Sequence, residues 1–245
     1  IGQTPLGELD MKSYAKDSSA EAVILADYGL SRLIKDDIRG YMTIYRRYTR
    51  IKILKKSAYN YANISVPFYR FSANQEEIVR DIQARTYNLK DGSMQYQEMG
   101  KSAIFEEKRS DKVYLSKFTL PNIHEGSVIE YSYTIESDLV SQLREWDFQR
   151  EAPTVKSEYW LYLIPNFEYR ILFQGIQQLT INENQSQMDG ISYHWGMANL
   201  PALRSEAYIT TLDDYRAKVW FELVSTNLPS QGKRDYAKKW EDLDR

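Results

Sequence analysis

The sequence predicts an all-β protein with an immunoglobulin-like β-sandwich, and three of its features carry that prediction. Runs rich in tyrosine and β-branched residues recur along the chain, and many of them alternate apolar with polar side chains. Asn, Asp, Gly and Pro separate these runs where turns would fall. The chain has 245 residues, which suffices for one enlarged sandwich or for two closely packed parts.

The expected elements follow one another in three parts. Residues 1–20 are polar and short of apolar anchors, so we expect an N-terminal arm. Residues 231–245 predict a short C-terminal helix, because Tyr236, Trp240 and Leu243 recur at three- and four-residue spacing. Residues 21–230 form the β-sandwich domain, with strands expected at 21–28, 41–45, 51–54, 59–66, 78–87, 94–99, 113–120, 128–137, 156–164, 169–173, 191–195 and 219–224.

One stretch combines two strands and a turn. Residues 117–137 read KFTLPNIHEGSVIEYSYTIES, in which Pro121-Asn122 opens a turn and Gly126 supplies the backbone freedom to reverse direction. Shortly after it come Trp146 and Phe148, large apolar residues that we expect to anchor the crossing between strands. The next apolar-rich segment contains Ser157-Glu158-Tyr159.

These segments resemble a bacterial domain-of-unknown-function family, number 3857, which forms the N-terminal domain of exported proteins with a transglutaminase-like cysteine-hydrolase domain. The resemblance runs in order over nearly the whole chain, including Asn199-Leu200-Pro201-Ala202 and a final Lys239-Trp240-Glu241-Asp242. We expect structural roles for the positions that mark the family, which are Pro121, Asn122, Gly126, Glu130, Trp146, Phe148 and Pro201.

The resemblance implies a non-catalytic module in an exported protein, periplasmic or on the cell surface. Such a module would pack against its own C-terminal transglutaminase-like domain, into which residues 231–245 would lead, and help to position a protein or peptide substrate. The chain has no cysteine, so it lacks the thiol nucleophile of that reaction. The residues from Ile1 onward carry no basic region followed by an apolar run, so export is implied by the resemblance alone.

Charge and hydropathy argue against nucleic acid and membrane partners. The formal net charge is −2, with acidic and basic residues interspersed. In the one basic run, Arg46, Arg50, Lys52 and Lys56 would share one strand face, which we expect to be solvated. No stretch approaches the roughly 20 apolar residues of a transmembrane helix.

The 20 tyrosines and 5 tryptophans suggest a second function, a free-standing module that binds a glycan or a peptide. Most of these rings should fill the core. An accessory domain predicts an apolar patch near Trp240, whereas a binding module predicts a concave aromatic groove elsewhere. The candidates for an exposed interaction surface are Tyr41, Tyr45, Tyr208, Tyr215, Tyr236 and Trp240.

The sequence favours no catalytic residue, metal site or cofactor. His124 lies in a turn beside Glu125, which favours a surface pair, and His194 lies in an expected strand, which favours a hydrogen-bonded sheet residue. A third alternative, a carboxylate hydrolase, would need paired acids in a cleft. The acids that could form such a pair are Glu106 or Glu107 with Asp213 or Asp214.

Overall fold

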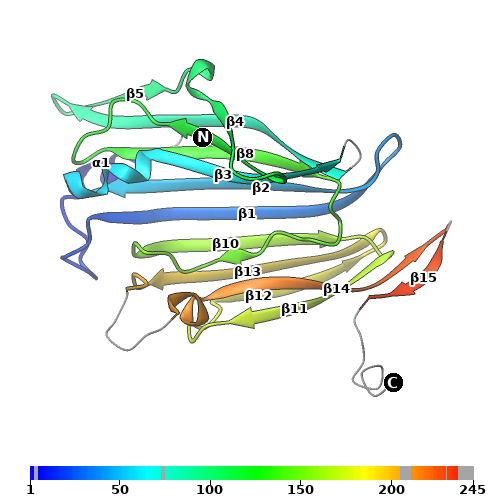
Figure 1. Ribbon diagram of the computed structural model, residues 1–245. Coiled ribbons are helices and arrows are strands. Elements are labelled where there is room, and N and C mark those ends of the chain that lie inside the picture. The colour runs from blue at the N-terminus through cyan, green and yellow to red at the C-terminus, as the bar shows by residue number, and fades with distance from the viewer. Residues whose placement is uncertain (3–4, 73–74, 205–210, 230, 237–245) are drawn as a thin grey trace.

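The computed structural model of the chain describes residues 1–2, 5–72, 75–204, 211–229 and 231–236. Strands dominate this part of the chain, and they form one eleven-stranded and one four-stranded sheet (Figure 1). The prediction of an all-β protein is therefore confirmed. The immunoglobulin-like sandwich stays a prediction, because the observed strand order does not confirm it.

The large sheet runs from a polar edge strand through the long central strands to a short edge. Its order is β12 (Ile181–Gln187), β13 (Gly190–Leu200), β10 (Thr154–Leu163), β1 (Ala22–Asp36), β2 (Gly40–Ile53), β8 (Val128–Ser137), β4 (Gln75–Lys90), β3 (Asn63–Ser72), β7 (Val113–Thr119) and β6 (Phe105–Lys108), with β5 (Ser93–Glu98) paired to β4. The pairing of β1 with β10 is parallel, and the neighbouring pairings are antiparallel.

The small sheet is centred on β14. It contains β11 (Phe167–Gln174), β14 (Lys218–Leu228) and β15 (Gly232–Asp235), with β9 (Trp146–Asp147) also paired to β14. The helical elements of the described residues are short, and they are α1 (Leu6–Asp10), η1 (Lys56–Ala62), η2 (Lys101–Ala103) and η3 (Leu212–Tyr215). None of the helices in the described ranges has the length and apolar character needed to cross a membrane.

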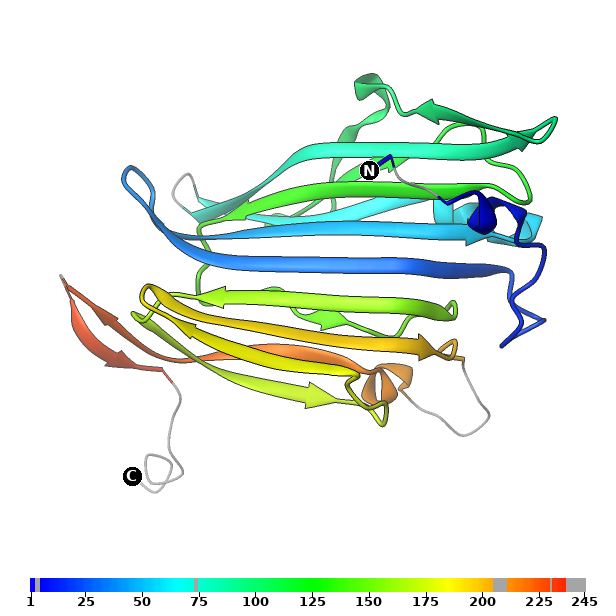
Figure 2. The same cartoon turned by 180° about the vertical axis from the view of Figure 1, so that it is seen from behind.

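Two layers cover one face of the large sheet. Strand β3 is joined to β4 through only two residue pairs, and β3, β7 and β6 turn back over the long strands. There Phe118 of β7 meets Tyr131 of β8 edge-on, with ring centroids 6.1 Å apart. The small sheet covers the other half of this face, where Phe221 lies 5.9 Å from Tyr159. Figure 2 shows the opposite face, called here the open face, with α1 across one end.

The core is fixed where the segment between β8 and β10, residues 138–153, crosses the large sheet. This segment is called the crossing segment. Trp146 is buried, with its ring stacked on Tyr159 at 5.4 Å and its Nε1 donating to Ser157 Oγ over 3.0 Å. On β1, Gly29 lies beneath this ring, and a Cβ at that position would come within 2.5 Å of the Trp146 ring. Only glycine leaves room for this packing.

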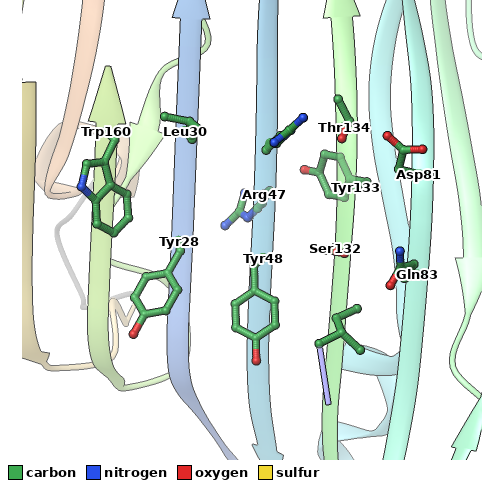
Figure 3. Close-up of a pocket in the computed structure, with 12 residues that line it drawn as sticks. Tyr28, Leu30, Arg47, Tyr48, Asp81, Gln83, Ser132, Tyr133, Thr134 and Trp160 are labelled. Atoms are coloured by element: carbon green, nitrogen blue, oxygen red, sulfur yellow. The ribbon is translucent and has the colours of Figure 1, made fainter. Parts of the chain in front are cut away.

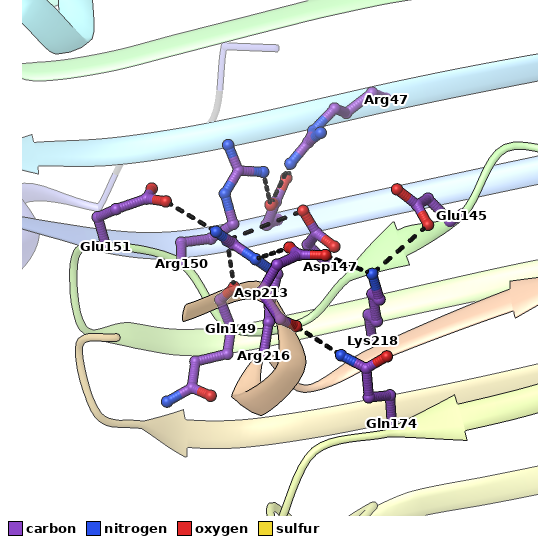
Figure 4. A network of polar contacts seen from close by, with 11 residues as sticks. Arg47, Glu145, Asp147, Gln149, Arg150, Glu151, Gln174, Asp213, Arg216 and Lys218 are labelled. Atoms are coloured by element: carbon purple, nitrogen blue, oxygen red, sulfur yellow. Dashed lines mark hydrogen bonds and ion pairs between the residues drawn. The ribbon is translucent and has the colours of Figure 1, made fainter. Parts of the chain in front are cut away.

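A polar network surrounds the same crossing (Figure 4). The buried Asp27 carboxylate accepts hydrogen bonds from Arg47 Nε at 3.0 Å and from Thr49 Oγ1 at 2.8 Å. The Arg47 guanidinium also lies 4.7 Å from the centre of the Trp146 ring. Because both charges leave water together and are hydrogen-bonded, the pair is tolerated within the core.

On the small-sheet side, Arg216 joins the network to η3. It lies 3.1 Å from both Glu151 and Asp213, and 3.8 Å from Asp147 of β9. Burial raises the pKa of Asp147, and the positive charge of Arg216 partly offsets that effect. The network therefore ties the crossing segment to both sheets.

The N-terminal arm packs on the open face. Leu9 of α1 joins a second apolar cluster, separate from the main core. Lys52 is fully buried, in contrast to the solvated face expected from sequence, because its Nζ donates to the carbonyls of Leu9 at 2.7 Å and Gly126 at 2.6 Å. Arg50 pairs with Glu8 at 2.9 Å. The arm thus turns part of the basic strand face into an interior.

The expected C-terminal helix is wrong over its first residues. Residues 232–235 form strand β15, paired to β14 in an antiparallel hairpin, and the Tyr236 N–H donates to the Val224 carbonyl at 2.8 Å. The spacing of apolar residues predicted a helix here. The backbone donors and acceptors of this segment are instead satisfied by pairing with the edge of the small sheet. Residues 237–245, with Trp240, lie outside the described residues.

Replacing the anchoring tryptophan should destabilise the fold. We expect Trp146→Ala to lower the free energy of unfolding by about 3–5 kcal/mol, because it removes a buried ring and leaves a cavity. Urea unfolding measures the loss. Trp220→Ala is the matched control, since that ring is 39% exposed and its loss should cost far less. Equal losses in the two variants would contradict the assigned role of Trp146.

Lys52 should make stability depend on pH. Burial is the main cause that lowers its pKa to about 8 from 10.5, with Lys12 adding to the effect. Between these values the unfolded chain binds more protons at Lys52 than the folded chain, so stability rises with pH. From pH 7.5 to 9.5, wild-type protein should gain about 1–2 kcal/mol relative to Lys52→Met. Parallel pH curves from urea unfolding would contradict this.

Candidate binding groove on the open face

The middle of the open face is hollowed into a groove of about 840 Å³. Its wall and floor come from strands β1, β2, β4, β8 and β10, and Figure 3 shows the side chains that line it. Its lining residues include Ile1, Tyr28, Arg46, Tyr48, Asp81 and Trp160. The groove lies beside the end of the face that the N-terminal arm covers.

Four rings from adjacent strands form an aromatic row across the open face. His194 of β13 stacks on Trp160 of β10 with ring centroids 4.4 Å apart. Trp160 meets Tyr28 of β1 edge-on at 6.0 Å, and Tyr28 stacks on Tyr48 of β2 at 6.0 Å. The rings share a face because strand alternation turns their buried neighbours, such as Tyr159, toward the core.

Charged residues fix one end of the aromatic row. Glu158 is buried beside Trp160, with its Oε2 2.9 Å from His194 Nε2 and its Oε1 2.6 Å from Lys156 Nζ. The hydrogen bond to Glu158 raises the pKa of Lys156, which also lies 5.6 Å from the centre of the Tyr28 ring. The carboxylate therefore orients His194 and Lys156 around the rings.

Glu130 fixes the other end. This fully buried carboxylate accepts hydrogen bonds from the hydroxyl groups of Tyr87 and Tyr48, the latter at 2.7 Å. Its Oε1 also accepts from the backbone N–H of Gly2 at 2.6 Å. Burial, and then the bond to Glu130, raises the pKa of Tyr48. Glu130 therefore holds a groove tyrosine and the N-terminal segment together.

Opposite charges lie on the two sides of Thr134 within the groove. Arg46 of β2 pairs in register with Thr134, and its side chain is exposed. On the far side, strand β4 bulges where its register with β8 shifts between Arg80 and Gln83. Asp81, in this bulge, has a φ of 53° and faces the groove (Figure 3). Bulges commonly redirect a side chain in this way.

The tyrosines expected to form an interaction surface do not gather in the groove. Tyr45 is 5% exposed, so its expected exposure is wrong, because the alternation of β2 turns it into the core. Tyr41 is half-buried against Phe167 at 5.1 Å. Tyr215 and Tyr236 are exposed, on η3 and just after β15. Tyr208 and Trp240 lie outside the described residues.

Sequence reasoning missed Tyr28, Tyr48 and Trp160. The signal that could have found Trp160 is the run Tyr159-Trp160-Leu161, where a buried Tyr159 forces its neighbour onto the opposite face. Recognising the aromatic row as a whole needs the order of four strands. Two of these strands, β10 and β13, lie more than 100 residues after β1 and β2 in the chain.

The positions that mark the family lie in the core, in the turn and beside the groove. Asn122 and Gly126 have φ angles of 55° and 91°, as the turn after β7 requires. Gln149 Nε2 donates to the Pro201 carbonyl at 3.1 Å. Phe148 and Trp146 are buried, Pro121 is half-buried, and Glu130 lies beneath the groove.

Three of the four acids of the carboxylate alternative pair with a cation. Glu106 contacts Arg70 at 3.0 Å and Glu107 contacts Lys117 at 2.6 Å, on β6 and its neighbours. Asp213 contacts Lys218 at 2.7 Å near the small sheet, and Asp214 lies exposed on η3. His124 is exposed in its turn, where its backbone N–H donates to Ser127 Oγ at 2.8 Å. In the described ranges, no group of three or more His, Asp or Glu side chains could hold a metal ion.

Residues 40–204 match the family model of DUF3857, a domain of unknown function for which a structure has been solved. The chain belongs to this family. The match includes β2, the turn between β7 and β8, the crossing segment and most of the groove residues. No curated protein matches this DUF3857 chain.

Among solved structures, the DUF3857 chain resembles a Parabacteroides distasonis protein described provisionally as a protease. The two are 15% identical with a TM-score of 0.67, over 84% of this chain and 41% of that one. A provisionally described nutrient binding protein from Legionella pneumophila gives a TM-score of 0.34 at 8% identity, over 82% and 67% of the two chains. Leukotriene A4 hydrolase from Saccharomyces cerevisiae gives a TM-score of 0.35 at 12% identity, over 93% of this chain and 34% of that one.

The likeness to the Parabacteroides protein concerns the fold alone. The DUF3857 chain spans about two fifths of the length of the Parabacteroides protein.

Proposed function

We propose that this chain is the non-catalytic N-terminal module of an exported transglutaminase-like protein. It packs against the catalytic domain of that protein and positions a protein or peptide substrate. The observation that carries the proposal is the groove on the open face, where the aromatic row meets the opposite charges of Arg46 and Asp81. Partly exposed rings beside a few polar groups are typical of a binding site.

Two further observations support the proposal. The chain has no cysteine, so a cysteine nucleophile would come from elsewhere in a longer protein. A chain of similar fold forms about two fifths of a protein that is described provisionally as a protease. Export and the transglutaminase-like partner domain rest on the family resemblance.

A second candidate is a free-standing module that binds a glycan. The aromatic row favours it, because rings from four adjacent strands offer apolar surface to the flat face of a sugar. Arg46 and Asp81 favour the peptide alternative, since they match charged side chains of both signs.

The proposed role predicts that groove rings affect substrate binding more than chemistry. In the full-length gene product, assayed for hydrolysis or acyl transfer on a peptide panel, Trp160→Ala should raise KM about ten-fold and leave kcat unchanged. Activity should be confined to the form that includes the downstream region, and that form should show a higher melting temperature for this module.

The matched control for this assay is Tyr96→Ala. Tyr96 is an aromatic residue that is 60% exposed on β5 and lies outside the groove. Its loss should leave KM at the wild-type value. An unchanged KM in Trp160→Ala would refute the proposed role of the groove. Activity in the short chain alone would contradict a non-catalytic module and would favour the carboxylate hydrolase.

A further inference from the structure

We infer that the groove binds an extended polypeptide segment, and that the N-terminal residues of this chain occupy part of the groove as a built-in competitor. The inference deepens the proposed function and rests on it. Two contacts carry it. Ile1 lines the groove together with Tyr48 and Trp160, and the Gly2 N–H donates to the buried Glu130 carboxylate. An apolar side chain of the chain itself is thus seated in the groove, and the peptide N–H of the next residue binds the carboxylate beneath the groove.

The seated residues belong to a longer element, which we call the N-terminal strap (residues 1–2 and 5–10). Beyond Gly2, the strap is fastened at Glu8, which pairs with Arg50 at 2.9 Å, and at Leu9, whose carbonyl accepts from Lys52. Arg50 Nε donates in turn to the Tyr48 hydroxyl at 2.9 Å. The Tyr48 hydroxyl donates to Glu130. Tyr48 therefore links the Gly2 contact at Glu130 to the Glu8 contact at Arg50.

Glu130 explains why a polypeptide suits the groove. A fully buried carboxylate is costly unless hydrogen bonds satisfy it. Two of its donors are tyrosine hydroxyls of the fold, and the third is the peptide N–H of Gly2. A ligand that displaces the strap must replace this donor, which an extended backbone can do. Gln83, Ser132 and Thr134 add polar side chains along the same groove.

The strap should lower the apparent affinity for any ligand from outside. A site that is free only part of the time binds more weakly in proportion to that fraction. Ile1 is 39% exposed, so the part of it that the groove covers gains from being seated there. Weakening that contact should raise the free fraction and tighten binding.

The experiment supplies the strap sequence from outside. A fluorescein-labelled peptide IGQTPLGELD, identical to residues 1–10, is titrated against the complete chain and followed by fluorescence anisotropy. Ile1→Ser should bind the peptide about five-fold more tightly than the wild type. The matched control is Leu6→Ser, because Leu6 belongs to the strap but is 56% exposed and lies outside the groove. Its affinity should equal that of the wild type.

Each outcome separates the alternatives. Equal affinities of wild type and Ile1→Ser for the peptide would overturn the role of the strap as a competitor. An equal gain in affinity in Leu6→Ser would overturn it as well. Displacement of the bound peptide by chitotriose would overturn the choice of polypeptide in favour of a glycan. The KM of full-length Trp160→Ala is an independent measurement. If it is unchanged while Ile1→Ser still binds more tightly, the strap stands and the role in substrate positioning fails.

Discussion

The packing of Trp146 on Gly29 is the constraint on which the rest of the structure depends. The crossing segment must lie flat on β1 for the small sheet to approach the core, and the absent side chain of Gly29 makes that possible. Trp146 then brings β9 into pairing with β14, which places the small sheet over half of the covered face. With one face closed in this way, the aromatic residues of the opposite face become available for a groove.

The open face has its own interior, built around charge. Lys52 and Glu130 are both fully buried on this side, and each is satisfied partly by atoms of the N-terminal arm. Apolar burial alone would not require the arm to take one position. The buried lysine and carboxylate do require it, because each of them would lose a hydrogen-bond partner if the arm left.

Much of the fold could be predicted from the sequence, but most of the groove could not. Alternation and turn residues are local signals, and they identified the turn around Gly126 and the strands on either side of it, although these strands, β7 and β8, pair with other strands rather than with each other. The C-terminal segment failed because pairing of Gly232–Asp235 with β14 overrode a helical spacing. The predicted exposure of Tyr45 was wrong for a related reason. The register of β2 between β1 and β8 decides which face Tyr45 lies on, and its neighbours in sequence do not.

The groove and the core are coupled through single strands. Tyr28 precedes Gly29 on β1, and Trp160 follows Tyr159 on β10, so each groove ring is one residue from a member of the Trp146 packing. Because successive side chains point to opposite faces, a shift of one residue in either strand would exchange groove and core. The tight fit around Trp146 therefore fixes the register that keeps the aromatic row on the open face, and a change in the core would alter the groove without touching a groove residue.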